Sequence, residues 1–404
     1  MPFKENTLKI ALVHDTDARR NIGCRLTSSM LKRSLINAAD NLDLNAFIHS
    51  VPWPFRRRTL LEEFQSMGWL SGTVTDEKLK KYARLEYGET GLSAVSDADL
   101  IVFQVEGRIK KNDSIEKIFR LFSLPIYASL ALRKKTIAMN GTICDRDDQN
   151  YDIIRELLGP FFMVSCRDRR SAEALNVDFI PDAAFSRTPS LVSKTPLLER
   201  RYVIVTTTAG KNGVENVNDA RTAISICQSM GWRPLILTMD HKALQPLFDE
   251  VLSLGGRVVD YADISYAEEL INDCICHIGG RYHMAILSAV CGVPSFLVTT
   301  NSHKNDWLVE NFYGIEWLDD LKSTCLQEVI GGMSIDQIIE DARAAGAAQR
   351  SGTQRVLLHA MESGMQRSSE VMVPNRMDDI LRLVRKDMRQ RIMRSAGRVL
   401  GMPS

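Results

Sequence analysis

The chain of 404 residues is long enough for two or three domains, each with a buried core. Its 51 Lys and Arg against 50 Asp and Glu leave a formal net charge of +1, so no global field favours nucleic acid or a membrane surface. No run approaches the length of a membrane span, the apolar N-terminal stretch is too short for a signal peptide, and the 8 cysteines sit mostly in apolar patterns, as reduced core cysteines do. We therefore expect a cytoplasmic protein in which any charged ligand is bound by a local group of charged side chains, not by the overall charge of the protein.

The first elements are a strand at 8–13, a helix at 22–39 and a strand at 44–48. The polar loop 15–23 follows the first strand, at the sheet edge where open α/β folds place their ligands. Asn21 and Gly23 are therefore candidate substrate-binding residues. A solvated loop in which Asn21 caps the helix explains the pattern equally well.

Residues 52–95 interrupt the alternation and are long for a simple connection. Two interpretations stay open. Interleaved basic and aromatic side chains suit a sugar or phosphate surface, whereas an inserted helical subdomain would use the aromatic side chains as its core. We favour the second. The residues concerned are Trp53, Phe55, Arg56, Arg57, Arg58, Trp69, Tyr82 and Tyr87.

Regular alternation resumes with strands at 100–103, 136–139, 161–166 and 177–180 and helices at 115–132 and 151–158. Arg167 stands where a strand passes into a helix, which makes it a candidate for binding an anion. The alternative is a surface salt bridge with Asp168 or Glu173, which would contribute little.

A segment rich in Ser, Thr and Pro at 186–201 predicts a domain boundary, and a second series of strands and helices runs from 202 to 298. Strands that alternate with helices indicate parallel, doubly wound sheets. The expected fold is α/β, with two Rossmann-like domains at 1–190, including the insertion 52–95, and at 198–345, facing a cleft. A helical C-terminal segment, 346–404, completes the chain, and we expect no metal site because Cys274 and Cys276 read as core residues.

The end of the chain predicts a basic amphipathic helix at 380–399. Such a helix can lie on an anionic membrane, which would make the protein peripheral at the inner face of the membrane. The commoner arrangement packs the helix against the body of the protein.

The stretch 276–304 holds three of the 7 histidines, His277, His283 and His303. A buried strand ends at Gly279 and Gly280, and an apolar helical pattern follows at once. Arg281, Tyr282 and His283 then fall in the first helical turn, where unpaired N–H groups and the helix dipole favour an anion. Arg281 opposes the dipole unless an anion is bound, and its planar fork fits a carboxylate or phosphate. A helix-capping or core role is the alternative for His283.

With these residues identified, the chain resembles the polysaccharide pyruvyltransferase family. The similarity rests on three segments: Gly280-Arg281-Tyr282-His283 with Gly292-Val293-Pro294 and Lys304, then Cys166-Arg167-Asp168 with Ile180-Pro181-Asp182, and Asn21-Ile22-Gly23. Cys24 stands where the family commonly has an acidic residue, and 104–107 where it usually has a glycine-rich turn.

The resemblance implies a glycosyltransferase-B-like architecture in which the first domain is the acceptor side and the second the donor side. It implies transfer of pyruvyl from phosphoenolpyruvate to a sugar, oligosaccharide or lipid-linked saccharide during surface or exopolysaccharide biosynthesis, with no cofactor. Arg281 and Arg167 would then bind the donor, and His283 would protonate the methylene or deprotonate the attacking hydroxyl. His303 and Lys304 would neutralise the departing phosphate.

Two other functions remain open at this stage. Two doubly wound domains equally suit a glycosyltransferase with a nucleotide-sugar donor, although no acidic ribose partner stands out in the second domain. A non-catalytic carbohydrate-binding relative is the third hypothesis, and fold analogy alone does not separate the three.

Overall fold

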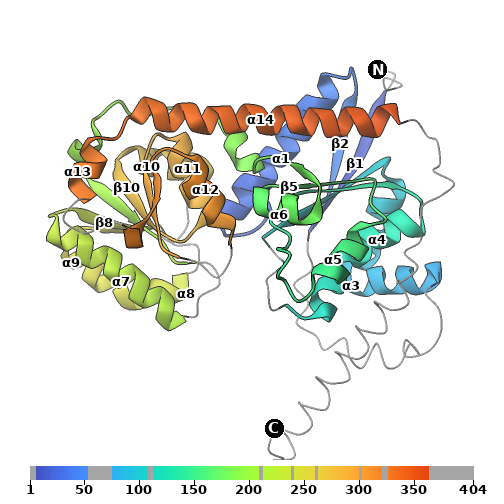
Figure 1. Ribbon diagram of the computed structural model, residues 1–404, viewed down its shortest axis with the longest axis horizontal. Helices are drawn as coiled ribbons and strands as arrows, with labels where there is room; N and C mark the ends of the chain where they lie inside the picture. Colours follow the sequence, from blue (N-terminus) through green and yellow to red (C-terminus); the bar gives the residue numbers. More distant parts are fainter. Residues whose placement is uncertain are drawn as a thin grey trace, which may run out of the picture. The chain divides into compact units, whose positions relative to one another are not determined.

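A computed structural model describes residues 6–52, 75–107, 109, 113–208, 213–237, 241–259, 263–299, 303–320 and 326–363. The chain forms two compact units (Figure 1). The described residues of the first unit fall within Met1–Asp15, Leu35–Phe179 and Gln354–Ser404, and those of the second within Thr16–Ser34 and Ile180–Thr353. The helices α1 (Ile22–Asp40) and α14 (Ile335–Glu362) each begin in the second unit and end in the first.

The first unit is built on a six-stranded parallel sheet with the order β2-β1-β3-β4-β5-β6. Its strands are β1 (Thr7–Asp15), β2 (Asn45–Pro52), β3 (Leu100–Glu106), β4 (Lys135–Gly141), β5 (Met163–Cys166) and β6 (Asp178–Phe179). Its helices, besides the end of α1, are α3 (Asp76–Asp97), α4 (Ile115–Leu130), α5 (Tyr151–Leu158) and α6 (Arg169–Leu175). The chain leaves β1 toward β2 and returns to β3 on the other side of β1, so β1 and β3 flank the topological switch point.

The second unit is built on a six-stranded parallel sheet with the order β12-β11-β10-β7-β8-β9. Its strands are β7 (Tyr202–Val205), β8 (Arg233–Leu237), β9 (Arg257–Val259), β10 (Cys274–Gly279), β11 (Ser295–Leu297) and β12 (Ile315–Trp317). Its α-helices are α7 (Gly213–Ser229), α8 (His241–Leu244), α9 (Phe248–Ser253), α10 (Ile264–Asn272), α11 (Tyr282–Val290), α12 (Asp306–Asn311) and α13 (Leu326–Gly331). Its 3-10 helices are η1 (Ala183–Ser186), η2 (Leu197–Glu199), η3 (Gln245–Leu247), η4 (His303–Asn305) and η5 (Leu318–Asp320).

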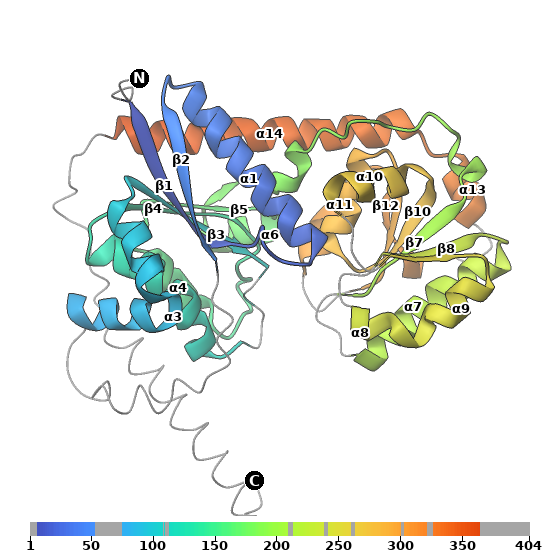
Figure 2. The same ribbon diagram turned by 180° about the vertical axis from the view of Figure 1, so that it is seen from behind.

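Helices cover both faces of the second sheet, with α7 and α9 on one face and α10 and α11 on the other (Figures 1 and 2). The chain passes from β9 to β10 by returning across β7, so the switch point of this sheet lies between β7 and β10. The predicted alternation of strands and helices is confirmed in both units.

Side-chain caps start several helices, as the sequence leads one to expect. Asn21 Oδ1 accepts from the backbone N–H groups of Gly23 at 2.9 Å and Cys24 at 3.2 Å, at the start of α1. Asp168 accepts from Ser171 N at 2.8 Å and so caps α6. The capping interpretation of Asn21 is therefore confirmed as a structural role.

The insertion is described only from residue 75 onward, where α3 packs on α4 over one face of the first sheet (Figure 1). Tyr82 and Tyr87 are buried in the same hydrophobic cluster as the strands. For these two rings the core interpretation holds. Trp53, Phe55, the three arginines 56–58 and Trp69 lie outside the described residues.

The predicted basic helix at 380–399 also lies outside the described residues. Before it, the expected helical pattern is present as α14. Among the helices that the structure describes, none is long and apolar enough to cross a bilayer. Cys274 and Cys276 are fully buried on β10, in agreement with their assignment to the core.

Candidate functional site

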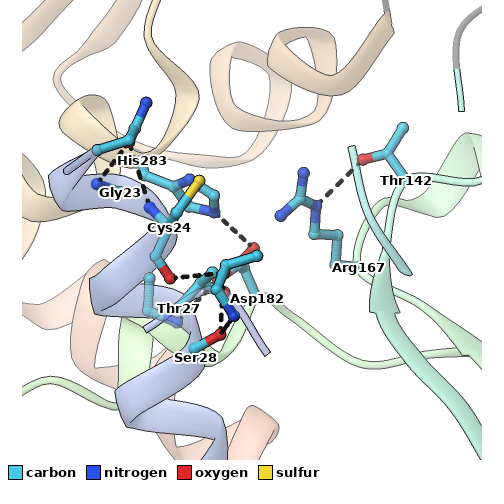
Figure 3. A network of polar contacts seen from close by, with 11 residues as sticks. Gly23, Cys24, Thr27, Ser28, Thr142, Arg167, Asp182 and His283 are labelled. Carbon is cyan, nitrogen blue, oxygen red and sulfur yellow. Dashed lines mark hydrogen bonds and ion pairs between the residues drawn. The ribbon is translucent and has the colours of Figure 1, made fainter. Parts of the chain in front are cut away.

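The second unit brings His283 and Asp182 together, although 101 residues separate them in sequence. His283 lies in the first turn of α11, and its Nε2 is 3.2 Å from Asp182 Oδ2 (Figure 3). The Asp182 side chain is completely buried, whereas 14% of the His283 side chain is exposed. The Nε2 edge of the imidazole is thus anchored on a buried carboxylate, while part of the His283 side chain remains exposed.

Asp182 is held in one orientation by two further donors. Its Oδ1 accepts from Thr27 Oγ1 at 2.9 Å and from Ala184 N at 2.8 Å (Figure 3). The second of these bonds makes Asp182 the N-cap of η1. A carboxylate fixed in this way leaves Oδ2 for the imidazole, so Nε2 donates and Nδ1 is the acceptor in the neutral ring.

Gly23, in the first turn of α1, lies against the same imidazole. A Cβ atom at this position would stand 2.7 Å from His283 Cβ and 2.8 Å from His283 Nδ1, closer than real Cβ contacts allow. Thr16 Oγ1 donates to the carbonyl oxygen of Cys24 at 2.9 Å and ties the preceding loop to the helix. The segment around Asn21 and Gly23 therefore belongs with His283, in the second unit.

Gly279 and Gly280 allow the ends of β7 and β10 to approach each other. Gly279 has φ 153, and a Cβ there would lie 2.3 Å from Thr206 Oγ1. A Cβ on Gly280 would lie 2.5 Å from Thr208 Cγ2. The glycine pair is thus required by packing at the switch point between the two strands.

Arg281 is the N-cap residue of α11, one position before the predicted first turn, and makes no capping bond. Its Nε donates to Thr207 Oγ1 at 2.7 Å, and Thr207 is buried at the end of β7. The threonine fixes the guanidinium at the carboxyl edge of the sheet, beside the backbone N–H groups of the first turn of α11. That edge can hold a carboxylate or a phosphate.

Tyr282, His303 and Lys304 are the remaining candidates in this unit. The buried Tyr282 ring packs edge-on against His283, with centroids 5.3 Å apart. His303 and Lys304 form η4, which leads into α12, and Trp307 and Phe312 of that segment pack on Phe185 of η1 at 6.1 and 4.7 Å. His303 and Lys304 therefore directly precede α12. The α12 segment packs on η1, the 3-10 helix that Asp182 caps.

Arg167 belongs to the first unit. Its side chain is only 2% exposed, which rules out the surface salt bridge considered for it. Arg167 Nε donates to Thr142 Oγ1 at 3.2 Å (Figure 3), and Arg167 Nη2 lies 3.0 Å from where a Cβ on Gly107 would be. A buried guanidinium at the carboxyl edge of the first sheet remains a candidate for binding an anion.

Sequence reasoning missed Asp182, Thr27 and Thr207 as functional partners. Asp182 was part of a noted motif, and an acid just after a short strand was the available signal for it. Thr27 and Thr207 carry no signal of their own, because only the folded chain shows that Thr27 donates to Asp182 and that Thr207 accepts from Arg281. In the described part of the chain, no group of three or more His, Cys, Asp or Glu side chains could hold a metal ion.

Comparison with known proteins identifies a family. Residues 25–302 match the family described as polysaccharide pyruvyl transferase, and this range includes Thr27, Arg167, Asp182, Arg281 and His283. No curated protein matches the chain in sequence.

Several solved structures share the fold at low identity. A protein described as a UDP-N-acetylglucosamine 2-epimerase from Listeria monocytogenes has a TM-score of 0.55 and 13% identity, over 91% of this chain and 98% of the other. The UDP-GlcNAc 2-epimerase of Methanocaldococcus jannaschii has a TM-score of 0.53 and 12% identity, over 87% and 99%. Sucrose-phosphate synthase from Thermosynechococcus elongatus has a TM-score of 0.52 and 10% identity, over 89% and 99%. These similarities confirm the predicted glycosyltransferase-B-like fold class.

Proposed function

Because the chain belongs to the polysaccharide pyruvyl transferase family, we propose that it transfers pyruvyl from phosphoenolpyruvate to two hydroxyls of a sugar. The product is a cyclic ketal, made during the synthesis of a surface or secreted polysaccharide. The observation that supports this proposal best is the His283–Asp182 pair, which stands two residues from Arg281 on the same helix start. The pair supplies proton transfer, and Arg281 supplies anion binding.

The reaction needs one group that moves a proton between oxygen and carbon. A hydroxyl proton must reach the methylene carbon of phosphoenolpyruvate, which becomes a methyl group, while the oxygen bonds to C2. The second hydroxyl then displaces phosphate, and its proton leaves with the phosphate. We assign the first transfer to His283 Nδ1, because Nε2 is engaged with Asp182.

Asp182 has the role of a positioning residue. Its buried carboxylate selects the tautomer that presents Nδ1 as acceptor, and it stabilises the ring while the ring carries the extra proton. Arg281 and Arg167 would bind the carboxylate and phosphate of the donor, and His303 and Lys304 would assist the departure of phosphate.

The direct test incubates the full chain with phosphoenolpyruvate and candidate saccharides and measures phosphate release together with the mass increase of one pyruvyl ketal. We expect both signals to depend on the acceptor. UDP-sugars in place of phosphoenolpyruvate should give no product. Transfer from a UDP-sugar, with none from phosphoenolpyruvate, would instead establish a glycosyltransferase.

Variants separate the roles of the residues. We expect His283→Ala and Asp182→Asn to lower kcat on the order of 100-fold, because each removes the basic Nδ1. The asparagine keeps an oxygen for Thr27 and Ala184 but turns an N–H group toward His283, so folding should persist. Arg281→Ala and Arg167→Ala should weaken phosphoenolpyruvate binding instead. Full activity in His283→Ala would contradict the assignment of the proton transfer.

A further inference from the structure

Three strands of the first sheet have a non-glycine residue in the left-handed region of the backbone at their last or last but one position. These are His14 with φ 70 at the end of β1, Glu106 with φ 51 at the end of β3 and Asn140 with φ 57 at the end of β4. A side chain in this conformation crowds the following carbonyl group, and glycine would adopt it more easily. The other described non-glycine residues with positive φ lie in turns, loops or a helix end: Asp43, Arg133 and Asn176.

The three residues lie at one edge of the sheet. The strands β1, β3 and β4 are adjacent, with Val13 opposite Phe103 and Glu106 opposite Gly141. His14 Nδ1 is 2.8 Å from the carbonyl oxygen of Gln104, so this nitrogen donates a hydrogen bond across β1 and β3. This is the switch point of the first sheet, where open α/β folds bind ligands.

Their side chains are buried although they are polar. His14 is 0% exposed, Glu106 3% and Asn140 4%. An imidazole, a carboxylate and a carboxamide together offer several donors and acceptors, which is the chemistry that recognises a polyhydroxylated ligand. Residues with an unfavourable backbone conformation are held in place by the surrounding structure and cluster at active sites and ligand-binding sites.

The same edge carries an anion-binding group. Arg167 N bonds to the carbonyl oxygen of Gly141 at 3.0 Å, and Arg167 Nη2 lies over Gly107, the residue after Glu106. The three residues and the guanidinium therefore lie at one edge of the sheet in the first unit.

We propose that His14, Glu106 and Asn140 form the site that binds the hydroxyls of the acceptor sugar. This inference rests on the proposed function, and it adds the residues that select the acceptor. The side chains at the three strand ends determine which sugar reacts.

Glycine substitution gives a sharp test, because glycine keeps the left-handed backbone and removes only the side chain. Glu106→Gly and Asn140→Gly should both keep a cooperative thermal transition, because glycine adopts the left-handed backbone conformation readily. Binding of methyl glycosides of galactose, glucose and mannose, measured by saturation-transfer NMR, should weaken about tenfold or more, since hydrogen bonds to the ligand are lost. Asn176→Gly is the matched control: it has the same backbone conformation at the end of α6 and should bind glycosides like the wild type. A glycoside with two hydroxyls blocked by a benzylidene acetal should bind less well.

The outcomes distinguish this inference from the proposed function. If no glycoside binds the wild-type chain, or if both glycine variants bind glycosides as well as the wild type, then His14, Glu106 and Asn140 do not form the acceptor site. Thermal shift with phosphoenolpyruvate is measured in parallel on the same proteins. Suppose that Glu106→Gly loses glycoside binding but phosphoenolpyruvate does not raise the melting temperature of the wild type. The sugar site would then stand, and the proposal that phosphoenolpyruvate is the donor would be wrong.

Discussion

At the scale of single residues, the site depends on a position with no side chain. Gly23 has an ordinary backbone conformation in the first turn of α1, where alanine would normally stabilise the helix by about 1 kcal/mol. The imidazole of His283 occupies the space instead, with Nδ1 2.8 Å from where a Cβ would be. Glycine at this position therefore leaves the space that the His283 ring occupies.

Gly23→Ala should lower kcat on the order of 100-fold, because the added methyl group displaces the ring and covers its acceptor nitrogen. The measurement is acceptor-dependent phosphate release at saturating phosphoenolpyruvate. Gly213→Ala is the control, since a Cβ at the start of α7 meets nothing within 4 Å among the described residues. Unchanged kcat in Gly23→Ala would mean that Nδ1 does not carry the proton.

At the scale of elements, β10 is joined to both neighbouring strands by one buried histidine. His277 Nε2 is 2.9 Å from Thr206 Oγ1, next to the end of β7, and His277 Nδ1 is 3.2 Å from Ser295 Oγ of β11. The ring is fully buried, and desolvation lowers the pKa of His277 to about 3. His277, itself a residue of β10, is thus a neutral side chain that links β10 to its neighbours on both sides.

The free energy of unfolding should fall as the pH is lowered from 7 to 5. The unfolded chain takes up a proton at the ordinary histidine pKa of about 6.5, whereas the folded protein resists protonation until about pH 3. Stability is therefore fully present above the unfolded pKa, and about 2 kcal/mol of it is lost at pH 5. Urea unfolding of wild type and His277→Gln measures the difference, with the exposed His49→Gln on β2 as control. Equal pH dependence in all three proteins would contradict a neutral His277.

The sequence predicted most of the elements and one half of the candidate site. Periodicity located the strands and helices of both units, and the glycine pair before Arg281 marked the end of β10. Asp182 could not be assigned to His283, because no local pattern relates residues 101 positions apart. The left-handed conformations of His14, Glu106 and Asn140 were also inaccessible, since ordinary strand residues precede them and the adjacent glycines, Gly107 and Gly141, do not show which residue takes the positive φ.

At the scale of the whole molecule, neither compact unit is a continuous stretch of chain. The second unit takes Thr16–Ser34 from near the N-terminus, whereas the linear pattern suggested a first domain at 1–190. This segment contributes Thr27 to Asp182, and its last residue, Ser34, donates to Gln349 Oε1 at 2.9 Å in the buried interior. The segment thus contributes to both the site and the buried interior of the second unit.

A fragment of residues 180–353 should not unfold cooperatively on its own, because it lacks Thr16–Ser34. Adding a synthetic peptide of residues 16–34 should restore a cooperative thermal transition, followed by circular dichroism. A peptide of residues 76–97, the α3 segment of the first unit, is the control and should have no effect. A fragment that melts like the full chain without peptide would show that the segment is dispensable for folding.

The burial of the cysteines also makes the chain convenient to label. Burial raises the pKa of the Cys144 and Cys227 thiols to about 12, and it raises those of Cys166, Cys274, Cys276 and Cys291 as well. Thiolates are the reactive form, so these side chains resist alkylation. Among the described cysteines only Cys24 is partly exposed, and it follows Gly23 directly. With Cys325, which lies outside the described residues, replaced by serine, a maleimide dye would attach to Cys24 by preference, and its fluorescence would report on the surroundings of the imidazole.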